Sequence, residues 1–173
     1  MKTIAIITSR WNSKRLPGKA LREINGKPML RNIIDIASSS VDEVVVATTP
    51  SSQPIIDYCI KENISYFVGD EEDILLRLYA TAIAYEADVI VRLWGDAPFV
   101  PAKQIVDAIH TFNHLGGYIS ITSRYGVVSV MPLELLEQTH RELTSMEDRH
   151  WIHKYMSKMK TIDTEEDLCG INS

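Results

Sequence analysis

The chain has 173 residues and a mass of 19.6 kDa, the size of one domain, so we expect a single domain over residues 1–173. Apolar residues make up 45% of the chain and charged residues 24%, a balance that excludes disordered, collagen-like and disulfide-scaffold proteins. The formal net charge is −5, and apolar runs such as residues 4–7 fall far short of the ~20 residues that a membrane span needs, so we expect no membrane partner.

The charge is divided unevenly along the chain. Residues 1–34 contain eight lysines and arginines and one glutamate, which gives this segment a charge of +7 and leaves −12 for the rest. A compact basic segment on an acidic body favours a small anionic ligand over nucleic acid, which needs an extended basic face. A solvated basic surface would explain the same charge pattern without any ligand.

Strand and helix patterns alternate from the first residues of the chain. Continuous apolar and β-branched runs predict strands buried on both faces, and apolar positions three and four apart predict helices between them. The predicted elements, in chain order, are a strand over 4–7, a helix over 28–37, a strand over 44–47, a helix over 54–61, a strand over 64–68, a helix over 72–86, a strand over 88–93 and a helix that starts at Pro101. This alternation is typical of βαβ units and predicts an α/β protein with a mostly parallel sheet in a three-layer α/β/α arrangement.

The regularity weakens after Gly116, although further elements are still predicted. Shorter apolar runs indicate strands, and polar-apolar periodicity indicates helices. The predicted elements in this part are strands over 118–122 and 127–130, helices over 132–143 and 147–159, and a strand over 160–162.

The spacing of cysteines and glycines excludes several common kinds of site. Cys59 and Cys169 are isolated, so we expect neither a zinc site nor a disulfide and place the protein in the reducing cytoplasm. The glycines form no G-x-G pair, which excludes the dinucleotide-binding fingerprint. A P-loop is excluded as well, because seven residues separate Gly18 from Gly26 and Lys27 precedes a proline.

Loop 8–19 follows a buried strand, at the edge of the sheet where ligands of open α/β proteins bind. It carries four cations, small hydroxyl residues and a Pro-Gly turn. Arg10, Arg15 and Lys19 are candidates for neutralising a triphosphate, and Gly18 would let the backbone approach it closely. A solvated loop with an ordinary Pro-Gly turn is the alternative. The same rule points to the loops over 48–53 and 94–100.

A long irregular pattern ties this loop to a known family. It reads Ser9-Arg10-x-x-Ser13-x-Arg15-Leu16-Pro17-Gly18-Lys19-x-Leu21, followed by Ile24-Asn25-Gly26-Lys27-Pro28-Met29-Leu30. The pattern resembles the opening of the sugar cytidylyltransferases, which include CMP-ketodeoxyoctonate synthetases, CMP-sialic acid synthetases and spore-coat polysaccharide biosynthesis proteins. The resemblance implies a Rossmann-like nucleotide-diphospho-sugar transferase fold and a loop that wraps the phosphates of CTP. The nucleotide-binding residues that it implies in the loop are Ser9, Arg10, Ser13, Arg15 and Lys19.

A second segment is similar to another part of the family's pattern. It consists of Gly69-Asp70 followed by Asp73-Ile74-Leu75-Leu76-Arg77. The similarity implies that Arg77 lies on the nucleotide side. Asp73 and Arg77 are also four residues apart on a predicted helix, so a simple ion pair between them is the alternative.

Two later runs resemble the family's metal-binding motifs. The run Arg92-Leu93-Trp94-Gly95-Asp96-Ala97-Pro98 resembles Arg-x-x-Gly-Asp-x-Pro, whose aspartate binds metal. A carboxylate after the carboxyl end of a strand would face a triphosphate, which supports Asp96 as a ligand of Mg²⁺. The run Asp163-Thr164-Glu165-Glu166-Asp167-Leu168 is similar to Asp-Thr-Pro-Glu-Asp-Leu and implies Asp163 as a second ligand. The alternatives are an ordinary turn for Asp96 and a helix N-cap for Asp163.

The aromatic and histidine residues carry weaker signals. Trp94 lies next to Asp96, where it could stack on a base or sugar or belong to the core. Trp11 is expected to be exposed or to act as a lid. The five histidines show no complete metal-ligand spacing and are expected on helix surfaces.

The resemblance covers residues 1–115 well and the remainder in patches. We therefore expect 1–115 to be the nucleotide-binding half and 116–173 to be a reduced part for sugar binding, which could also support a homodimer. The implied reaction is Mg²⁺-dependent transfer of CMP from CTP to an acidic or other sugar in surface polysaccharide biosynthesis, with Arg15, Lys19 and Asp96 as catalytic residues. Two alternatives stay open. One is a shortened relative that binds a nucleotide or a partner without turnover, and the other is a nucleotidyltransferase that uses GTP or UTP.

Overall fold

The computed structural model describes residues 1–13, 16–150, 152–156 and 161–163. The strands are β1 (Thr3–Thr8), β2 (Glu23–Ile24), β3 (Lys27–Pro28), β4 (Glu43–Thr48), β5 (Tyr66–Val68), β6 (Val89–Trp94), β7 (Tyr118–Ser123), β8 (Gly126–Pro132) and β9 (Thr161–Asp163). The helices are α1 (Met29–Ala37), α2 (Gln53–Lys61), α3 (Ile74–Ala84), α4 (Ala102–Leu115), α5 (Leu133–Glu142), α6 (Met146–His150), α7 (Ile152–Met156) and the short 3₁₀ helix η1 (Lys19–Leu21). The strands and helices predicted before Gly116 are all present, with small shifts at their ends.

In the described part of the chain, seven strands form one sheet in the order β5-β4-β1-β6-β8-β7-β9. β1 pairs in parallel with β4 on one side and with β6 on the other, and β4 pairs in parallel with β5. β8 runs antiparallel to its neighbours β6 and β7. The chain leaves β1 for β4 and β5 and then returns past β1 to β6, so the strand order reverses beside β1. The prediction of a mostly parallel sheet is confirmed.

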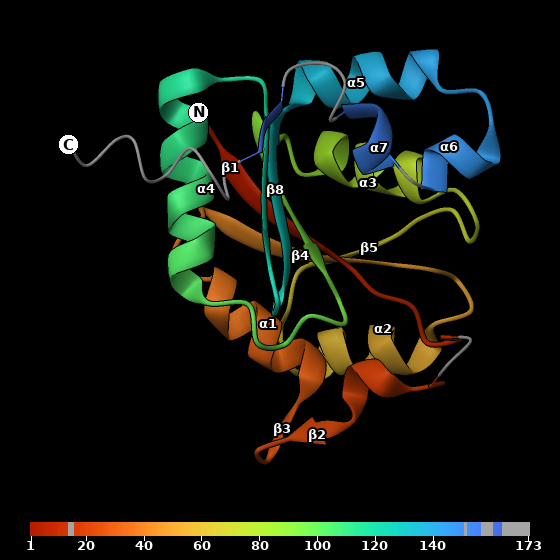
Figure 1. Ribbon diagram of the computed structural model, residues 1–173. Coiled ribbons are helices and arrows are strands. Elements are labelled where there is room, and N and C mark those ends of the chain that lie inside the picture. The colour runs from red at the N-terminus through yellow and green to blue at the C-terminus, as the bar shows by residue number, and fades with distance from the viewer. Residues whose placement is uncertain (14–15, 151, 157–160, 164–173) are drawn as a thin grey trace.

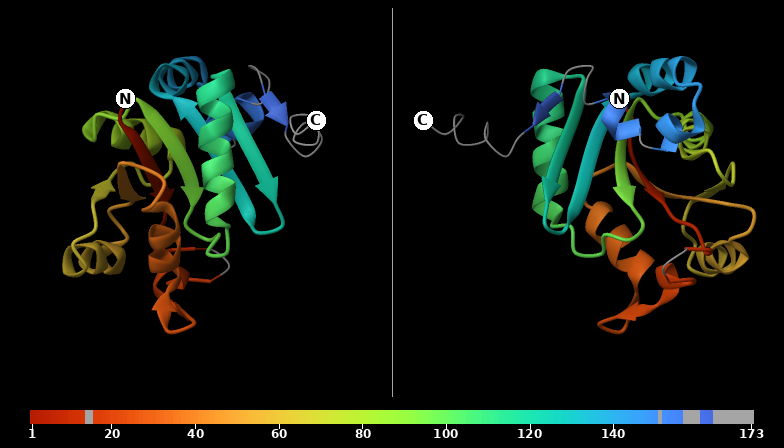
Figure 2. Two further views of the ribbon diagram at one scale, coloured as in Figure 1. Left: turned by 90° about the vertical axis from the view of Figure 1, so that its left-hand side faces the viewer. Right: turned by 45° about the vertical axis from the view of Figure 1, so that its right-hand side comes forward.

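Helices cover both faces of this sheet, which confirms the predicted three-layer arrangement (Figure 1 and Figure 2). Alternate residues of β1 point to opposite faces. Ala5 and Ile7 lie in the core under α1, α2 and α4, whereas Ile4 and Ile6 lie in the core under α3, α5 and α7. Close packing on both sides fixes the ends of the strands and the start of the loops that follow them.

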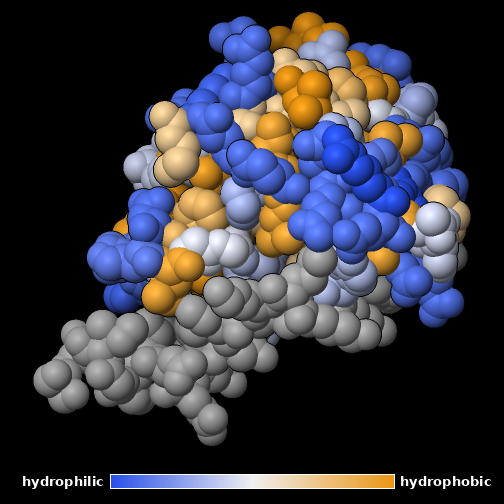
Figure 3. Space-filling view, turned by 90° about the horizontal axis from the view of Figure 1, so that it is seen from above, coloured by the Kyte–Doolittle hydropathy of each residue, from blue (hydrophilic) through white to orange (hydrophobic). Residues whose placement is uncertain are grey.

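The outer helices carry polar residues on their solvent side. α5 buries Leu136 and Thr139, while Glu134 and Gln138 are exposed. On the face seen from above, hydrophilic residues lie between smaller groups of apolar ones (Figure 3). No helix in the described part of the chain is long and apolar enough to cross a membrane.

Two features of the structure differ from the predicted elements. The unpredicted hairpin β2–β3 turns at Asn25 and Gly26, whose φ values of 54° and 78° are readily adopted by an Asn-Gly pair. The helix predicted over 147–159 is described as two short helices, α6 and α7. Helices this short are not stable alone, so their placement depends on tertiary contacts.

A buried ion pair supplies the contact that fixes α6 against α3. Arg149 Nε donates to Asp73 Oδ2 at 2.7 Å, and Arg149 Nη1 donates to the carbonyl oxygens of His140 and Leu143. Asp73 Oδ1 accepts from the backbone N–H of Leu76 at 2.9 Å and thereby caps α3. The pair holds the end of α6 close to the start of α3.

We predict that Arg149→Met destabilises the protein by about 3–5 kcal/mol, because it leaves the Asp73 carboxylate buried without its charged partner. Arg141→Met is the matched control, since Arg141 pairs with Glu137 on the surface and its loss should change stability by less than about 1 kcal/mol. Chemical unfolding followed by circular dichroism measures both free energies. Equal stability of the two variants would contradict a structural role for the buried pair.

Candidate functional site

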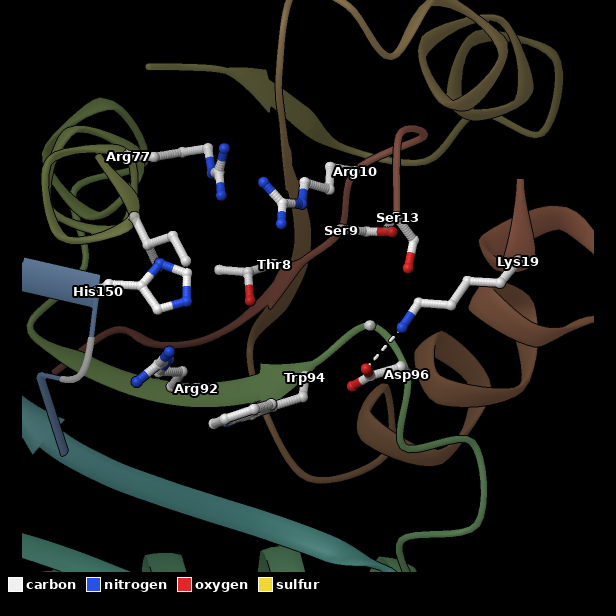
Figure 4. A pocket seen from close by; sticks show the side chains of 12 residues that line it. Thr8, Ser9, Arg10, Ser13, Lys19, Arg77, Arg92, Trp94, Asp96 and His150 are labelled. Atoms are coloured by element: carbon white, nitrogen blue, oxygen red, sulfur yellow. Dashed lines mark hydrogen bonds and ion pairs between the residues drawn. The ribbon is translucent and has the colours of Figure 1, made fainter. Parts of the chain in front are cut away.

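A pocket of about 330 Å³ opens at the carboxyl ends of β1 and β6, the edge of the sheet predicted to bind ligands. The loops after these strands line it together with residues of α3 and α6 (Figure 4). Its lining residues are Thr8, Ser9, Arg10, Ser13, Lys19, Ile74, Arg77, Arg92, Trp94, Gly95, Asp96 and His150. The structure therefore brings together the predicted residues Ser9, Arg10, Ser13, Lys19, Arg77 and Asp96.

The pocket forms where β1 and β6 run side by side to their last residues. Thr8 is paired with Trp94, and the backbone N–H of Gly95 donates to the carbonyl oxygen of Thr8 at 3.0 Å. A Cβ at position 95 would lie 2.7 Å from that oxygen and 2.9 Å from the Cβ of Ser9. The absence of a side chain at Gly95 therefore lets the loop after β6 lie against the loop after β1.

Trp11 organises the described part of the loop after β1. Its carbonyl oxygen accepts from the N–H groups of Ser13 and Gly18, both at 2.9 Å, and its own N–H donates to Ser52 Oγ at 2.9 Å. Gly18 has a φ of 70°, and a Cβ there would lie 2.9 Å from the Trp11 indole. Because Trp11 is half-buried against the core, the expectation of an exposed residue is wrong, while a lid role stays a prediction.

Lys19 and Asp96 meet at one end of the pocket. Lys19 Nζ donates to Asp96 Oδ2 at 2.6 Å and so joins residues 77 positions apart in the chain (Figure 4). Both side chains are partly accessible to solvent, so a ligand can reach each of them. When a metal-bound phosphate ligand enters, this ion pair can be replaced by two new contacts: the ammonium binds a phosphate oxygen and the carboxylate binds the metal ion.

Arg77 reaches the pocket from α3 and is buried. Its Nη1 donates to the carbonyl oxygen of Asp70 at 2.8 Å, and its Nε has no hydrogen-bond partner among the described residues. A Cβ at Gly69 would lie 2.8 Å from Cγ of Arg77, so this glycine makes room for the side chain. Asp73 pairs with Arg149, and the alternative of a helical ion pair between Asp73 and Arg77 is wrong.

Arg92 projects from β6 into the pocket and was not predicted to be a binding residue. Its guanidinium carbon lies 5.3 Å from the centre of the Trp94 ring, a cation–π contact. Burial and the nearby charge of Arg77 lower the pKa of Arg92 to about 10, so the group is still charged at neutral pH. Trp94 therefore lines the pocket and supports the Arg92 cation.

His150, at the end of α6, also lines the pocket, so the expectation of a helix-surface histidine is wrong for this residue. Burial lowers the pKa of His150, and the positive charges of the neighbouring arginines lower it further. The imidazole is therefore neutral at pH 7 and lies among cations (Figure 4). The arginines that face it are Arg10, Arg77 and Arg92.

Two predicted site residues are not placed by the structure. Arg15 lies outside the described residues, and so does the side chain of Asp163, whose backbone ends β9 beside β7. Within the described part of the chain, no three or more His, Cys, Asp and Glu residues gather closely enough to hold a metal ion. Asp96 is the one predicted metal ligand whose side chain the structure describes at the pocket.

Comparison with known proteins assigns the family. A model of the cytidylyltransferase family matches residues 4–168, which include the pocket-lining residues and every motif described above. The chain belongs to the cytidylyltransferase family. The resemblance stated from the opening motif is thereby confirmed.

Named cytidylyltransferase relatives match the chain over part of their length. A 3-deoxy-manno-octulosonate cytidylyltransferase of Trichlorobacter lovleyi is 34% identical over 114 residues, which cover 65% of this chain and 45% of the relative. The spore coat polysaccharide biosynthesis protein SpsF of Bacillus subtilis is 36% identical over 103 residues, which cover 55% of this chain and 43% of SpsF. The chain thus spans less than half the length of these curated relatives.

A solved structure supports the cytidylyltransferase fold. The structure of a cytidylyltransferase from Leptospira borgpetersenii serovar Hardjo-bovis superposes with a TM-score of 0.85 at 24% identity. The superposition covers 96% of this chain and 78% of that chain. The Rossmann-like fold implied by the opening motif is therefore confirmed.

We predict that the pKa of His150 lies below the ordinary value of 6.5 and rises when Arg77 is replaced by glutamine. The folded state binds this proton more weakly than the unfolded state does. Protonation of His150 therefore lowers the free energy of unfolding: the protein is fully stable in this respect above about pH 6.5, and it loses stability as the pH falls through the pKa of the folded state. NMR titration of the imidazole measures the pKa. Arg22→Gln removes an exposed cation outside the pocket and should leave it unchanged, whereas a pKa at or above 6.5 would contradict this placement of His150.

Proposed function

We propose that this protein is an enzyme that transfers CMP from CTP to a sugar and releases pyrophosphate. The main support for the proposal is the pocket. Residues of the family's opening pattern line it, and its lining includes four cations and one carboxylate. Such an excess of positive charge suits anionic substrates, of which a triphosphate is one. Membership of the cytidylyltransferase family favours CTP over GTP and UTP.

The loop after β1 supplies the phosphate-binding groups in this proposal. Arg10 and Lys19 line the pocket, and Ser9 and Ser13 offer hydroxyl groups beside them (Figure 4). We assign these side chains to the nucleotide together with Arg15, for which the family pattern is the support. Guanidinium and ammonium groups form short charge-assisted hydrogen bonds with phosphate oxygens and would stabilise the charge that develops on pyrophosphate.

The proposed reaction is a direct displacement at phosphorus. An oxygen of the sugar, from a hydroxyl or a phosphate group, attacks the α-phosphorus of CTP and forms a new P–O bond. The bond from the α-phosphorus to the oxygen that bridges it to the β-phosphate breaks, and pyrophosphate leaves. When the attacking oxygen belongs to a hydroxyl group, its proton is released to water. Positioning and charge neutralisation supply most of the rate enhancement in such transfers, so no nucleophilic side chain is needed.

Asp96 is the residue that we assign to a divalent metal ion. Its carboxylate lies at the pocket, where Lys19 neutralises it in the structure, and carboxylate oxygens are the ligands that Mg²⁺ prefers. Asp163 is the second ligand predicted from the family pattern. When bound, Mg²⁺ supplies further neutralisation of the phosphate charge. In this proposal Lys19 leaves Asp96 and binds a phosphate oxygen.

The names of the relatives guide the choice of acceptor. One is a 3-deoxy-manno-octulosonate cytidylyltransferase, and another acts in spore coat polysaccharide biosynthesis. We therefore propose an acidic or related sugar as the acceptor and surface polysaccharide biosynthesis as the process. A cytoplasmic location suits an enzyme that consumes CTP, and a homodimer through residues 116–173 stays a prediction.

We predict that the protein releases pyrophosphate from CTP when Mg²⁺ and a suitable acceptor are present, and that Asp96→Asn lowers this rate by about 100-fold or more. Pyrophosphate release is measured across a panel of sugar acids and sugar phosphates. Arg22→Gln, a surface variant outside the pocket, should keep the full rate. If CTP binds but no acceptor yields pyrophosphate, the alternative of a relative that binds the nucleotide without turnover is favoured.

A further inference from the structure

The pocket has two chemically different ends. At one end Lys19 and Asp96 form an ion pair, so their charges compensate each other. At the other end Arg77, Arg92 and His150 lie around a common space, which the guanidinium of Arg10 also faces (Figure 4). Asp96 is the only carboxylate among the described residues that line the pocket, so this second end has no acidic lining residue.

The two arginines of this end are buried and have unused hydrogen-bonding capacity. Arg77 is 3% exposed and Arg92 is 4% exposed, and the Nε atom of each lacks a hydrogen-bond partner within the described part of the chain. Asp70, Glu71 and Asp73 offset part of the charge of Arg77 from outside the pocket lining. A buried cation without a contacting anion is unfavourable, and so is a buried N–H group without an acceptor. A ligand that brings both negative charge and oxygen atoms would satisfy both requirements.

Charge and donor geometry favour a phosphoryl group over a carboxylate at this end. The two buried guanidinium groups offer two positive charges and paired N–H donors, which match a dianionic phosphate with three terminal oxygens. Arg10, which we assign to the nucleotide, adds a further positive charge beside them. A carboxylate carries one charge and would leave one buried guanidinium uncompensated. Burial and the neighbouring arginines lower the pKa of His150, so its neutral ring adds no positive charge at pH 7.

We propose that Arg77 and Arg92 form a second anion site in the pocket, which binds a phosphoryl group on the sugar acceptor. This proposal rests on the proposed function. It assigns Arg77 to the acceptor, whereas the family pattern places that arginine on the nucleotide side. Lys19 and Ser13 lie away from this end and remain available to the triphosphate (Figure 4). Trp94 positions Arg92 through the cation–π contact. The acceptor class is a sugar phosphomonoester.

The test is a calorimetric titration of inorganic phosphate into protein saturated with CTP and Mg²⁺, at constant ionic strength, with acetate as the carboxylate probe. Phosphate should bind to the saturated protein more tightly than acetate does. Arg92→Gln and Arg77→Gln should each weaken phosphate binding by about tenfold or more and weaken CTP binding much less. Arg92→Lys keeps the positive charge but not the paired N–H donors, so it should weaken phosphate binding less than Arg92→Gln does. Arg22→Gln makes the same charge change outside the pocket and should have no effect.

Three results would overturn the second anion site. Failure of phosphate to bind once CTP is in place, or an equal loss of CTP and phosphate affinity in Arg92→Gln, would return both arginines to the nucleotide. Acetate binding as tight as phosphate binding would replace the phosphoryl group by a carboxylate. Circular dichroism checks the fold of each variant, and Arg77→Gln carries the test if Arg92→Gln does not fold.

Failure of the proposed function gives a different result. Failure of turnover alone leaves CTP and phosphate binding without release of pyrophosphate, and the titration above still applies. Failure at the nucleotide itself leaves a wild-type protein that binds no CTP. Titration of phosphate into the nucleotide-free protein then tests the anion site alone, since an effect of Arg92→Gln on phosphate affinity would support the site and its absence would overturn it.

Discussion

The parallel pairing of β1 with β6 is the constraint on which the pocket depends. It holds to the last residue of each strand because Gly95 has no side chain to separate its N–H from the carbonyl oxygen of Thr8. Two loops that are far apart in the chain are thereby brought together at one edge of the sheet. The contact between Lys19 and Asp96, across 77 positions of sequence, follows from this adjacency.

The charges of the pocket are local rather than part of a general basic surface. The basic segment 1–34 supplies Arg10 and Lys19, but other cations of that segment are neutralised elsewhere, as where Lys27 pairs with Asp35. The remaining two pocket arginines come from α3 and β6, which belong to the acidic remainder of the chain. Two buried guanidinium groups without carboxylate partners in the described pocket lining therefore point to an anionic ligand, and a solvated basic surface does not explain them.

Most of the fold could be predicted because buried strands leave continuous apolar runs and covering helices leave periodic ones. The family pattern also indicated Lys19 and Asp96. Arg92 left a partial signal, a charged residue within an apolar strand, but the face to which it points depends on the register with β1. The position of His150 could not be predicted, because α6 is held by an ion pair between residues 76 positions apart. Local patterns carry no information about such a contact.

The central claim is that the pocket binds CTP with a divalent metal ion. Calorimetric titration of CTP, GTP, UTP and ATP, first with Mg²⁺ and then with EDTA, tests this claim most directly. We predict that CTP binds about tenfold or more tightly than the other three nucleotides and that EDTA weakens its binding. Equal binding of all four nucleotides, or no binding of any, would contradict the claim and leave the loop after β1 with a purely structural role.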